Sequence, residues 1–416
     1  MSTHQPEDRL ASLRGPLAPE PCTARGITAL TANPGCSRRA VLDAAGVDKA
    51  TLAERLGRPA RFGQSPFALA RGRAFEAMVK ANGYAELIAL LRENLGAPVE
   101  EAAVADLNEV AGSASPALRA RETERVFDRL AGGDEERVLL DHPVLELEVA
   151  GRTALLEPDA VTHRVGGRFH VVEIKSFAVI DGQADPAKTA EAAKQAAVYV
   201  IALRRLLERL GHDPELVAPE FLLVCPKDFS QRPILARIDV RQEIEAIGFQ
   251  LSRLRRADDL ARPLPAGATL DLSTRPDGAP TRTDTELAGT VAALDTHYTP
   301  DCLGYCDLAR HCRAEAVETA RPGRLGGRAR DDLPGIDSTR VALSLIDTPG
   351  DRGEPDDPDR AEVAERLRAA ARLYDLRRPP GPRVSSVPFA RSGPSGSIEP
   401  SGSSGSADTI AGRSVG

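Results

Sequence analysis

Two carboxylates and a lysine near the middle of the chain have types and a spacing that suit metal-dependent hydrolysis. A Glu-Pro-Asp sequence ends at Asp159, and a Glu-Ile-Lys sequence runs from Glu173 to Lys175. Carboxylate oxygens bind hard cations such as Mg²⁺ and Mn²⁺. The chain uses only six lysines against forty-eight arginines, so a lysine here is unusual for this sequence. Beside a metal, a lysine can orient a water in a way that arginine cannot. The pattern therefore predicts cleavage of phosphodiesters.

Two adjacent strands must position these groups. Residues 155–161 and 169–174 are apolar-rich, with Gly166 and Gly167 between them, which predicts a hairpin. Side chains two apart on a strand share a face, so Glu173 and Lys175 project together and Ile174 points away. A three-residue loop at 165–167 sets Asp159 opposite Glu173, whereas a two-residue loop sets it opposite Ile174. The functional interpretation needs an odd loop or a bulge. The alternative is a surface hairpin whose charges face water.

A helix upstream of the hairpin brings a third acid. It is predicted to start at Ser65 and Pro66 and to stop at Asn82 and Gly83. It contains the sequence Arg-Gly-Arg-Ala-Phe-Glu, which ends at Glu76. A carboxylate at this position is a competent ligand for a hard metal ion.

A long helix downstream is predicted over 187–210, closed by Gly211. Gln195 and Tyr199 lie at positions i and i+4 and therefore share one of its faces. The alternative interpretation is an ordinary helix surface.

This order of motifs resembles the PD-(D/E)xK nuclease superfamily, and within it the RecB-like iron–sulfur exonuclease branch. The resemblance spans about 36–312, discontinuously, and implies an α/β restriction-endonuclease-like core with a mixed sheet flanked by helices. It implies catalysis by Asp159, Glu173 and Lys175, with Gln195 and Tyr199 positioning substrate. It implies that Mg²⁺ or Mn²⁺ is held by Asp159, Glu173, the Ile174 carbonyl and Glu76, where members of the family often carry histidine.

The cysteines supply a second set of ligands. Cys302, Cys306 and Cys312 lie within eleven residues, and Cys36 follows a loop that enters a helix. A tetrahedral metal or cluster needs a fourth ligand, for which Cys36 is the candidate. The resemblance implies a [4Fe–4S] cluster held by one cysteine before the nuclease core and three after it. The family usually begins its trio Cys-x2-Cys, and here the gap is one residue longer.

Other interpretations of the cysteines stay open. The same four ligands also suit a structural Zn²⁺, and in that case His311 or His297 is an alternative to one of the cysteines. Disulfides are disfavoured in a reducing compartment. Cys22 is an alternative fourth ligand, in a segment that reads as unfolded, and Cys225 is predicted to be a buried strand residue.

Composition divides the chain into three parts. Residues 1–26 are predicted to be disordered, and 27–320 to form the nuclease domain with strands at 144–149, 154–161, 169–176, 220–225 and 234–240. Residues 321–416 are rich in Gly, Pro, Ser, Asp and Arg and are predicted to be mostly disordered, with one amphipathic helix over 359–376.

Charge and hydropathy bear on the partners. The net charge is −7, so nothing global indicates nucleic acid. Local basic pairs at Arg38–Arg39 and at Arg71 and Arg73 suit contact with DNA phosphates, and the alternative is an ordinary solvated face of an arginine-rich chain. No apolar run is long enough to cross a membrane, and the first residues do not form a signal peptide, which predicts a cytoplasmic protein.

The prediction is a metal-dependent DNA nuclease, acting on single-stranded or free-ended DNA in repair, recombination or phage defence. Its partners would be DNA and a helicase or another repair or defence protein. The alternatives are a non-catalytic DNA-binding or scaffold module that kept the fold, and a restriction-type endonuclease with structural zinc.

Overall fold

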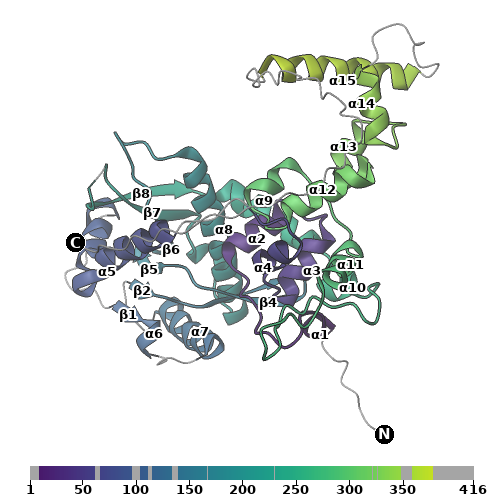
Figure 1. Ribbon diagram of the computed structural model, residues 1–416. Coiled ribbons are helices and arrows are strands. Elements are labelled where there is room, and N and C mark those ends of the chain that lie inside the picture. Colours follow the sequence, from purple (N-terminus) through teal and green to yellow (C-terminus); the bar gives the residue numbers. More distant parts are fainter. Residues whose placement is uncertain are drawn as a thin grey trace, which may run out of the picture.

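The fold is mixed α/β, with a six-stranded mixed sheet flanked by helices and a separate two-stranded hairpin (Figure 1). The computed structural model describes residues 9–60, 66–95, 104–110, 115–133, 139–165, 167–228, 230–320, 322–325, 327–347 and 358–377. No helix within these ranges is both long and apolar enough to span a membrane.

The large sheet has the strand order β1-β2-β5-β6-β7-β8. The bounds are β1 Val104–Asp106, β2 Leu139–Asp141, β5 Ala160–Val165, β6 Arg168–Ile174, β7 Glu220–Pro226 and β8 Pro233–Asp239. The pairs β1–β2 and β6–β7 are parallel, and the other neighbours are antiparallel. The central strands β6 and β7 are buried along most of their length, which explains why their sequences read as continuous apolar runs. The three strands predicted over 169–176, 220–225 and 234–240 are confirmed.

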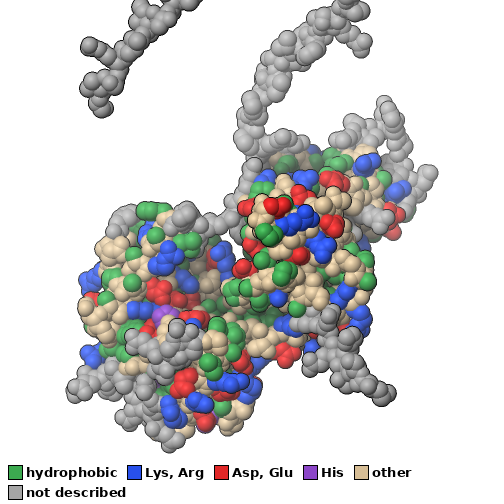
Figure 2. Space-filling model, turned by 60° about the horizontal axis from the view of Figure 1, so that its bottom comes forward, with side chains coloured by type: hydrophobic (Ala, Val, Ile, Leu, Met, Phe, Trp, Pro, Cys, Tyr) green, Lys and Arg blue, Asp and Glu red, His purple; other side chains and the backbone are tan. Residues whose placement is uncertain are grey.

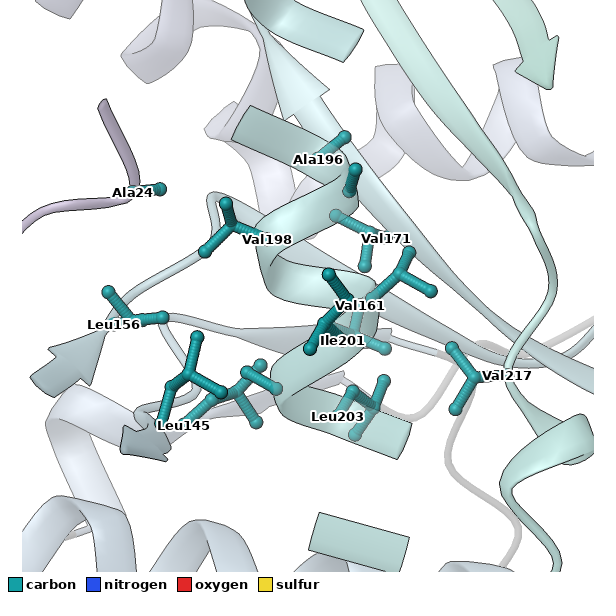
Figure 3. Packing of buried hydrophobic residues seen from close by; sticks show 14 of the residues in the cluster. Ala24, Leu145, Leu156, Val161, Val171, Ala196, Val198, Ile201, Leu203 and Val217 are labelled. Carbon is teal, nitrogen blue, oxygen red and sulfur yellow. The ribbon is translucent and has the colours of Figure 1, made fainter. Parts of the chain in front are cut away.

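Two long helices cover opposite faces of this sheet. Helix α8 (Pro186–Leu210) packs against Val161 and Val171, as Figure 3 shows. Helix α5 (Pro66–Leu95) packs through its buried apolar side chains against Val172. Because successive residues of a strand point to opposite faces, α8 and α5 lie on different sides of β6. The end of β6 therefore lies between two helices that can both contribute side chains.

The predicted strand over 154–161 is wrong. Residues 152–156 form β4, which pairs only with β3 (Leu145–Val149) in the hairpin, and β5 starts at Ala160. The break falls at the Glu-Pro-Asp sequence, where Pro158 has no amide hydrogen to donate to a neighbouring strand. Helices α6 (Leu107–Val110) and α7 (Pro116–Gly132) precede the hairpin.

Helices from the N-terminal part of the chain and helices that follow the sheet in sequence pack together beside the sheet (Figure 1). The N-terminal helices are α2 (Ala24–Thr31), α3 (Ser37–Ala45) and α4 (Lys49–Arg55). They meet α9 (Arg241–Arg253), α10 (Ala257–Ala261), α11 (Asp284–Ala292) and α12 (Ala309–Thr319), with the short helices η1 (Pro214–Leu216) and η2 (Pro300–Gly304) in the same half of the chain. The Arg38 amide donates to the Asp295 carbonyl at 2.8 Å. The body of the protein is therefore closed by contacts between residues that are far apart in sequence.

The two ends of the chain contain more structure than predicted. Residues 1–26 were predicted to be disordered, but α1 (Arg9–Arg14) packs on α3 and α10 because Leu10 and Leu13 form one buried face. The predicted helix over 359–376 is α15 (Pro358–Arg377), and it packs on α14 (Thr339–Asp347), which was not predicted. With η3 (Pro322–Leu325) and α13 (Gly327–Asp331), these helices project from the body (Figure 1). Residues 1–8 and 378–416 lie outside the described ranges.

Candidate active site and cysteine group

A β-bulge places Asp159 opposite Glu173. Strands β5 and β6 pair in one register up to Thr162, and the register has shifted by one residue at Val165, which pairs with Arg168. Extending the first register by one residue beyond β5 sets Asp159 against Glu173. The prediction that the site needs a bulge or an odd loop is confirmed in the form of the bulge, and the alternative three-residue loop is wrong.

Lys175 and Glu173 project to the same side at the end of β6. Lys175 Nζ lies 2.5 Å from Glu173 Oε2. Ile174 packs with the α5 side of the sheet, while its backbone N–H donates to Asp159 Oδ2 at 2.6 Å. The predicted faces of these three residues are confirmed, and the loop before β5 is fastened to β6 beside the lysine. The Ile174 carbonyl as a metal ligand stays a prediction.

Burial raises the pKa values of both acids, Asp159 and Glu173. Glu173 is 1% exposed, and burial together with the nearby Asp159 carboxylate raises its pKa to about 7, although Lys175 opposes the shift. Burial also raises the pKa of Asp159 above its ordinary value. Burial alone would lower the pKa of Lys175, but the carboxylates of Glu173 and Asp159 raise it above its usual range. Since burial makes the negative charges costly, a bound cation would relieve the site.

Helix α5 brings Glu76 to these acids from the opposite face of the sheet. Its charge is one of the causes that raise the pKa values of both Asp159 and Glu173. The helix passes close to the end of β6, because a Cβ built on Gly72 would lie 3.7 Å from Ser176 Oγ. The predicted start at Pro66 is confirmed, and Ser65 lies outside the described residues. The predicted stop is a kink, since the backbone leaves helical geometry from Ala81 to Tyr84.

Helix α8, which covers the face of the sheet opposite α5, carries the predicted pair Gln195 and Tyr199. Lys175 Nζ donates to Gln195 Oε1 at 3.4 Å. Tyr199 is largely buried, and burial followed by the charges of Glu173 and Asp159 raises the pKa of its phenol above the ordinary range. Both side chains therefore face the acids, which excludes the interpretation as an ordinary helix surface. Their effect on substrate stays a prediction.

A second group of charged residues next to Glu76 was missed by the sequence interpretation. Lys80 Nζ forms ion pairs with Glu76 Oε1 at 2.7 Å and with Asp141 Oδ1 at 2.9 Å. Asp141 is 1% exposed, and it also accepts a 2.6 Å hydrogen bond from the Tyr84 hydroxyl. His142 Nδ1 lies 2.7 Å from Asp141 Oδ2. The available signal was Lys80 itself, a rare lysine one helical turn after Glu76.

Two residues of this second group have a strained backbone conformation. Tyr84 at the kink has φ of 65°, and His142 directly after β2 has φ of 50°. Non-glycine residues in this left-handed region are strained and persist only where the surroundings determine them. Both of them direct a polar side chain at Asp141.

The donor set of the acids suits a hard divalent cation. Glu76, Asp159 and Glu173 offer oxygen atoms only, which Mg²⁺ and Mn²⁺ prefer. Glu173 Oε1 is buried and has no hydrogen-bond partner within the described part of the chain. Among the described residues, the three ligand atoms that all lie within 4.8 Å belong to Asp106, Asp141 and His142, and the predicted trio is spaced more widely. Figure 2 shows acidic side chains gathered with a histidine in a recess of the surface.

The predicted fourth cysteine lies with the C-terminal trio. The hydroxyl of Thr296 contacts Cys36 Sγ at 3.8 Å and Cys312 Sγ at 3.7 Å. Cys306 is close enough that the charges of Cys312 and Cys36 act on its pKa, which burial raises to about 12. Cys302 is buried in the same apolar cluster as Cys312, and its Sγ lies 3.5 Å from Asn33 Nδ2. We call Cys36, Cys302, Cys306 and Cys312 the cysteine group.

Two arginines that were candidates for contact with DNA phosphates, or for a solvated face, instead lie inside the protein. Arg38 is 1% exposed and donates to Cys312 Sγ at 3.1 Å and to Glu315 at 2.7 Å. Arg39 is also buried and pairs with Asp43 at 3.0 Å. The prediction that this pair contacts phosphates is wrong, because their guanidinium groups are satisfied beside the cysteine group. Arg71 and Arg73 are exposed on α5.

The remaining cysteines lie elsewhere. Cys225 is a buried residue of β7, as predicted. Cys22 was placed in an unfolded segment, but it is partly buried against the main core beside α2, and burial raises its pKa to about 12. His297 lies against Gly35, where a Cβ would be 2.7 Å from its ring, so it stays near Cys36.

Comparison with known proteins gives no family for this chain. No family model and no curated protein matches it. A solved structure described as "Crystal structure of SSO0001" has a TM-score of 0.16 and 14% sequence identity over 40% of this chain and 86% of that chain. A likeness with so low a TM-score says nothing about the fold or the function of this protein.

Proposed function

We propose that the protein is a metal-dependent DNA nuclease with a restriction-endonuclease-like core of the RecB-like PD-(D/E)xK type. The observation that carries the proposal is the meeting of Asp159, Glu173 and Lys175 at the end of β6. The bulge in β5 sets the first two opposite each other, and the ion pair of 2.5 Å holds the lysine against them. A surface hairpin with solvated charges would not bury Glu173 to 1% exposure.

The acids are the residues that would hold Mg²⁺ or Mn²⁺. Asp159, Glu173 and Glu76 provide the oxygens, and the unpaired Glu173 Oε1 is free to bind an ion. Bound there, such an ion supplies Lewis-acid polarisation of the scissile phosphate and a more acidic water.

The side chains around the acids position the reactants. Lys175 keeps its proton near neutral pH, because Glu173 and Asp159 raise its pKa. Its ammonium can therefore donate to the attacking water and offset charge that develops on the phosphate. Gln195 accepts from Lys175 and limits its rotation. Tyr199 remains a neutral phenol because its pKa is raised, so it can donate a hydrogen bond but does not release its proton.

The substrate proposed is single-stranded or free-ended DNA. The exposed Arg71 and Arg73 lie within two turns of Glu76 on α5, and α5 passes the end of β6 near Ser176. Cationic side chains at this distance can bind phosphates on either side of the cleaved bond. Repair, recombination and phage defence remain the proposed settings, with a helicase or another repair or defence protein as partner.

The cysteine group is proposed to hold a structural [4Fe–4S] cluster. A Zn²⁺ ion and a [4Fe–4S] cluster both bind four thiolates, and what supports the cluster is the resemblance of one cysteine before the core and three after it to the iron–sulfur branch. Burial raises the pKa of the Cys312 thiol, and the guanidinium of Arg38, which donates to its sulfur, opposes that rise. The cluster would join the two ends of the nuclease domain and take no part in hydrolysis.

Incubation with defined DNAs tests this function. Anaerobically purified protein with Mn²⁺ should degrade linear single-stranded DNA and leave a covalently closed plasmid intact. The Asp159→Asn variant should cleave neither DNA. Nicking or linearisation of the plasmid would instead indicate an internal endonuclease. No cleavage of any DNA, with binding retained, would favour the non-catalytic module.

A further inference from the structure

The ammonium of Lys80 lies in a position that has the donors of a metal site. Its Nζ is 2.7 Å from Glu76 Oε1 and 2.9 Å from Asp141 Oδ1. It is 3.1 Å from the Asp159 carbonyl oxygen and 3.4 Å from His142 Nε2. Three oxygens and one imidazole nitrogen therefore surround one point in space.

These four donors come from three places in the chain, since His142 directly follows Asp141. Glu76 is on α5, Asp141 ends β2, and Asp159 precedes β5. Carboxylate, carbonyl and imidazole are all ligands of divalent ions such as Mn²⁺ and Zn²⁺. The chain fills their centre with a side chain of its own that carries a positive charge.

The position of Lys80 is fixed. Its side chain is only 10% exposed, and the partner Asp141 is 1% exposed. Asp141 is also held by Tyr84 and His142, both from strained backbone. Leaving this lysine for solvent would abandon a buried carboxylate, so the ammonium stays where it is.

The same acid, Glu76, belongs to the site that we assign to the catalytic ion. An ammonium 2.7 Å from its carboxylate competes with any ion that approaches from the Asp141 side. The charge of Lys80 acts on the carboxylate of Asp159 as well, but more weakly than the charge of Lys175 does.

We propose that Lys80 is a specificity-determining residue that restricts the acids around Glu76 to one divalent ion. Its ammonium takes the place that a second ion would hold against Glu76, Asp141 and His142. The inference rests on the proposed function, because it concerns the metal content of the same site. The catalysis so described uses one ion, with Lys80 supplying the second positive charge.

The test is the amount of Mn²⁺ bound to the full-length protein, counted by elemental analysis after desalting. The wild type should carry one ion and Lys80→Ala two. Lys80→Arg, which keeps the cation, should carry one. The matched control Lys188→Ala, in the exposed first turn of α8, should also carry one. Adding His142→Ala to Lys80→Ala should return the count to one.

Folding of each variant is followed by circular dichroism and thermal melting. Lys80→Gln replaces Lys80→Ala if the latter does not fold, since its shorter amide leaves the Nζ position free. An equal Mn²⁺ content in the wild type and in the folded uncharged variant would overturn the inference. A gain of one ion that His142→Ala does not reverse would overturn it too.

The outcomes separate this inference from the proposed function. If the wild-type ion is insensitive to Asp159→Asn while Lys80→Ala still gains a second ion, the catalytic metal site is wrong and the role of Lys80 stands. If Asp159→Asn removes the wild-type ion but Lys80→Ala gains none, the role of Lys80 is wrong and the catalytic site stands. Absence of Mn²⁺ from every variant would overturn both.

Discussion

The carboxylate of Asp159 accepts a 2.6 Å hydrogen bond from the backbone amide of Ile174. This bond fastens the loop after Pro158 to β6 between the two residues that carry the proposed chemistry, Glu173 and Lys175. It uses one oxygen of Asp159 and leaves the other for a cation. The carboxylate of Asp159 is therefore oriented by a backbone group of β6 and not by another side chain.

Replacing Glu76 tests whether it is a metal ligand. Glu76→Ala should lower the cleavage rate by about 10- to 100-fold, the range observed when a group that supports a metal is lost. Glu76→His should restore part of the rate, with Mn²⁺ more effective than Mg²⁺, because imidazole suits the softer ion. Initial rates at saturating metal measure the effect. Wild-type rates in both variants would show that Glu76 only pairs with Lys80.

Mn²⁺ should bind more tightly as the pH rises through about 7. Burial and Asp159 raise the pKa of Glu173 to about 7 from its ordinary 4.5, so a proton occupies the carboxylate of the metal-free protein at a pH below about 7. This proton stabilises the metal-free fold below a pH of about 4.5, and the contribution is lost as pH rises through about 7. A metal ion replaces it above that pH.

Calorimetric titration with Mn²⁺ from about pH 5.5 to about pH 8 measures this linkage, and Glu173→Gln is the control. The variant has no proton to release at this position and should bind weakly at every pH. An affinity of the wild type that does not change across this range would contradict the prediction.

Anaerobically purified protein should be brown and contain iron. Cys302→Ala and Cys36→Ala should both remove the colour and lower thermal stability, since a cluster between them closes a loop of more than two hundred residues. Cys22→Ala and Cys225→Ala are matched controls, one partly buried and one fully buried. Iron and zinc analysis provides the measurement.

Colour loss in Cys22→Ala but not in Cys36→Ala would show that Cys22 is the fourth ligand. A colourless wild type with one zinc would keep the cysteine group and remove iron from the account.

Arg38→Met should lower the free energy of unfolding by roughly 3 kcal/mol, the order measured when one partner of a buried ion pair is removed. The change leaves Glu315 without its 2.7 Å partner and removes the donor to Cys312. Denaturant unfolding provides the value. Arg71→Met is the control, because that side chain is exposed, and it should change stability by less than about 0.5 kcal/mol. Equal stability of the two variants would contradict the role given to Arg38.

Local pattern predicted those parts of the site that depend on a short range of sequence. The shared face of Glu173 and Lys175 follows from the two-residue period of a strand. Helix α8 follows from its apolar pattern, and it ends as predicted at Gly211, with φ of 82°. Even the need for a bulge followed from counting residues around the hairpin, although its place between Thr162 and Val165 did not.

What the sequence could not predict depends on tertiary contacts. Asp141 lies on a strand of three residues that no periodic pattern announces, and only the packed sheet brings it to Lys80. The burial of Arg38 has a similar cause, because its partner Glu315 lies on α12 and reaches it only when α12 packs near α3, whereas Asp43, the partner of Arg39, is a neighbour on α3 itself. Charge runs in an arginine-rich chain do not reveal which of them fold inward.

The most direct test of the account is the rate of single-turnover cleavage of linear single-stranded DNA by Lys175→Ala. The account predicts a loss of at least about a hundredfold, because the group that orients the water is gone. DNA binding should stay near that of the wild type and of the Lys188→Ala control, and circular dichroism should show that the variant is folded at the assay temperature. Cleavage by Lys175→Ala at the wild-type rate would contradict the assignment of the site.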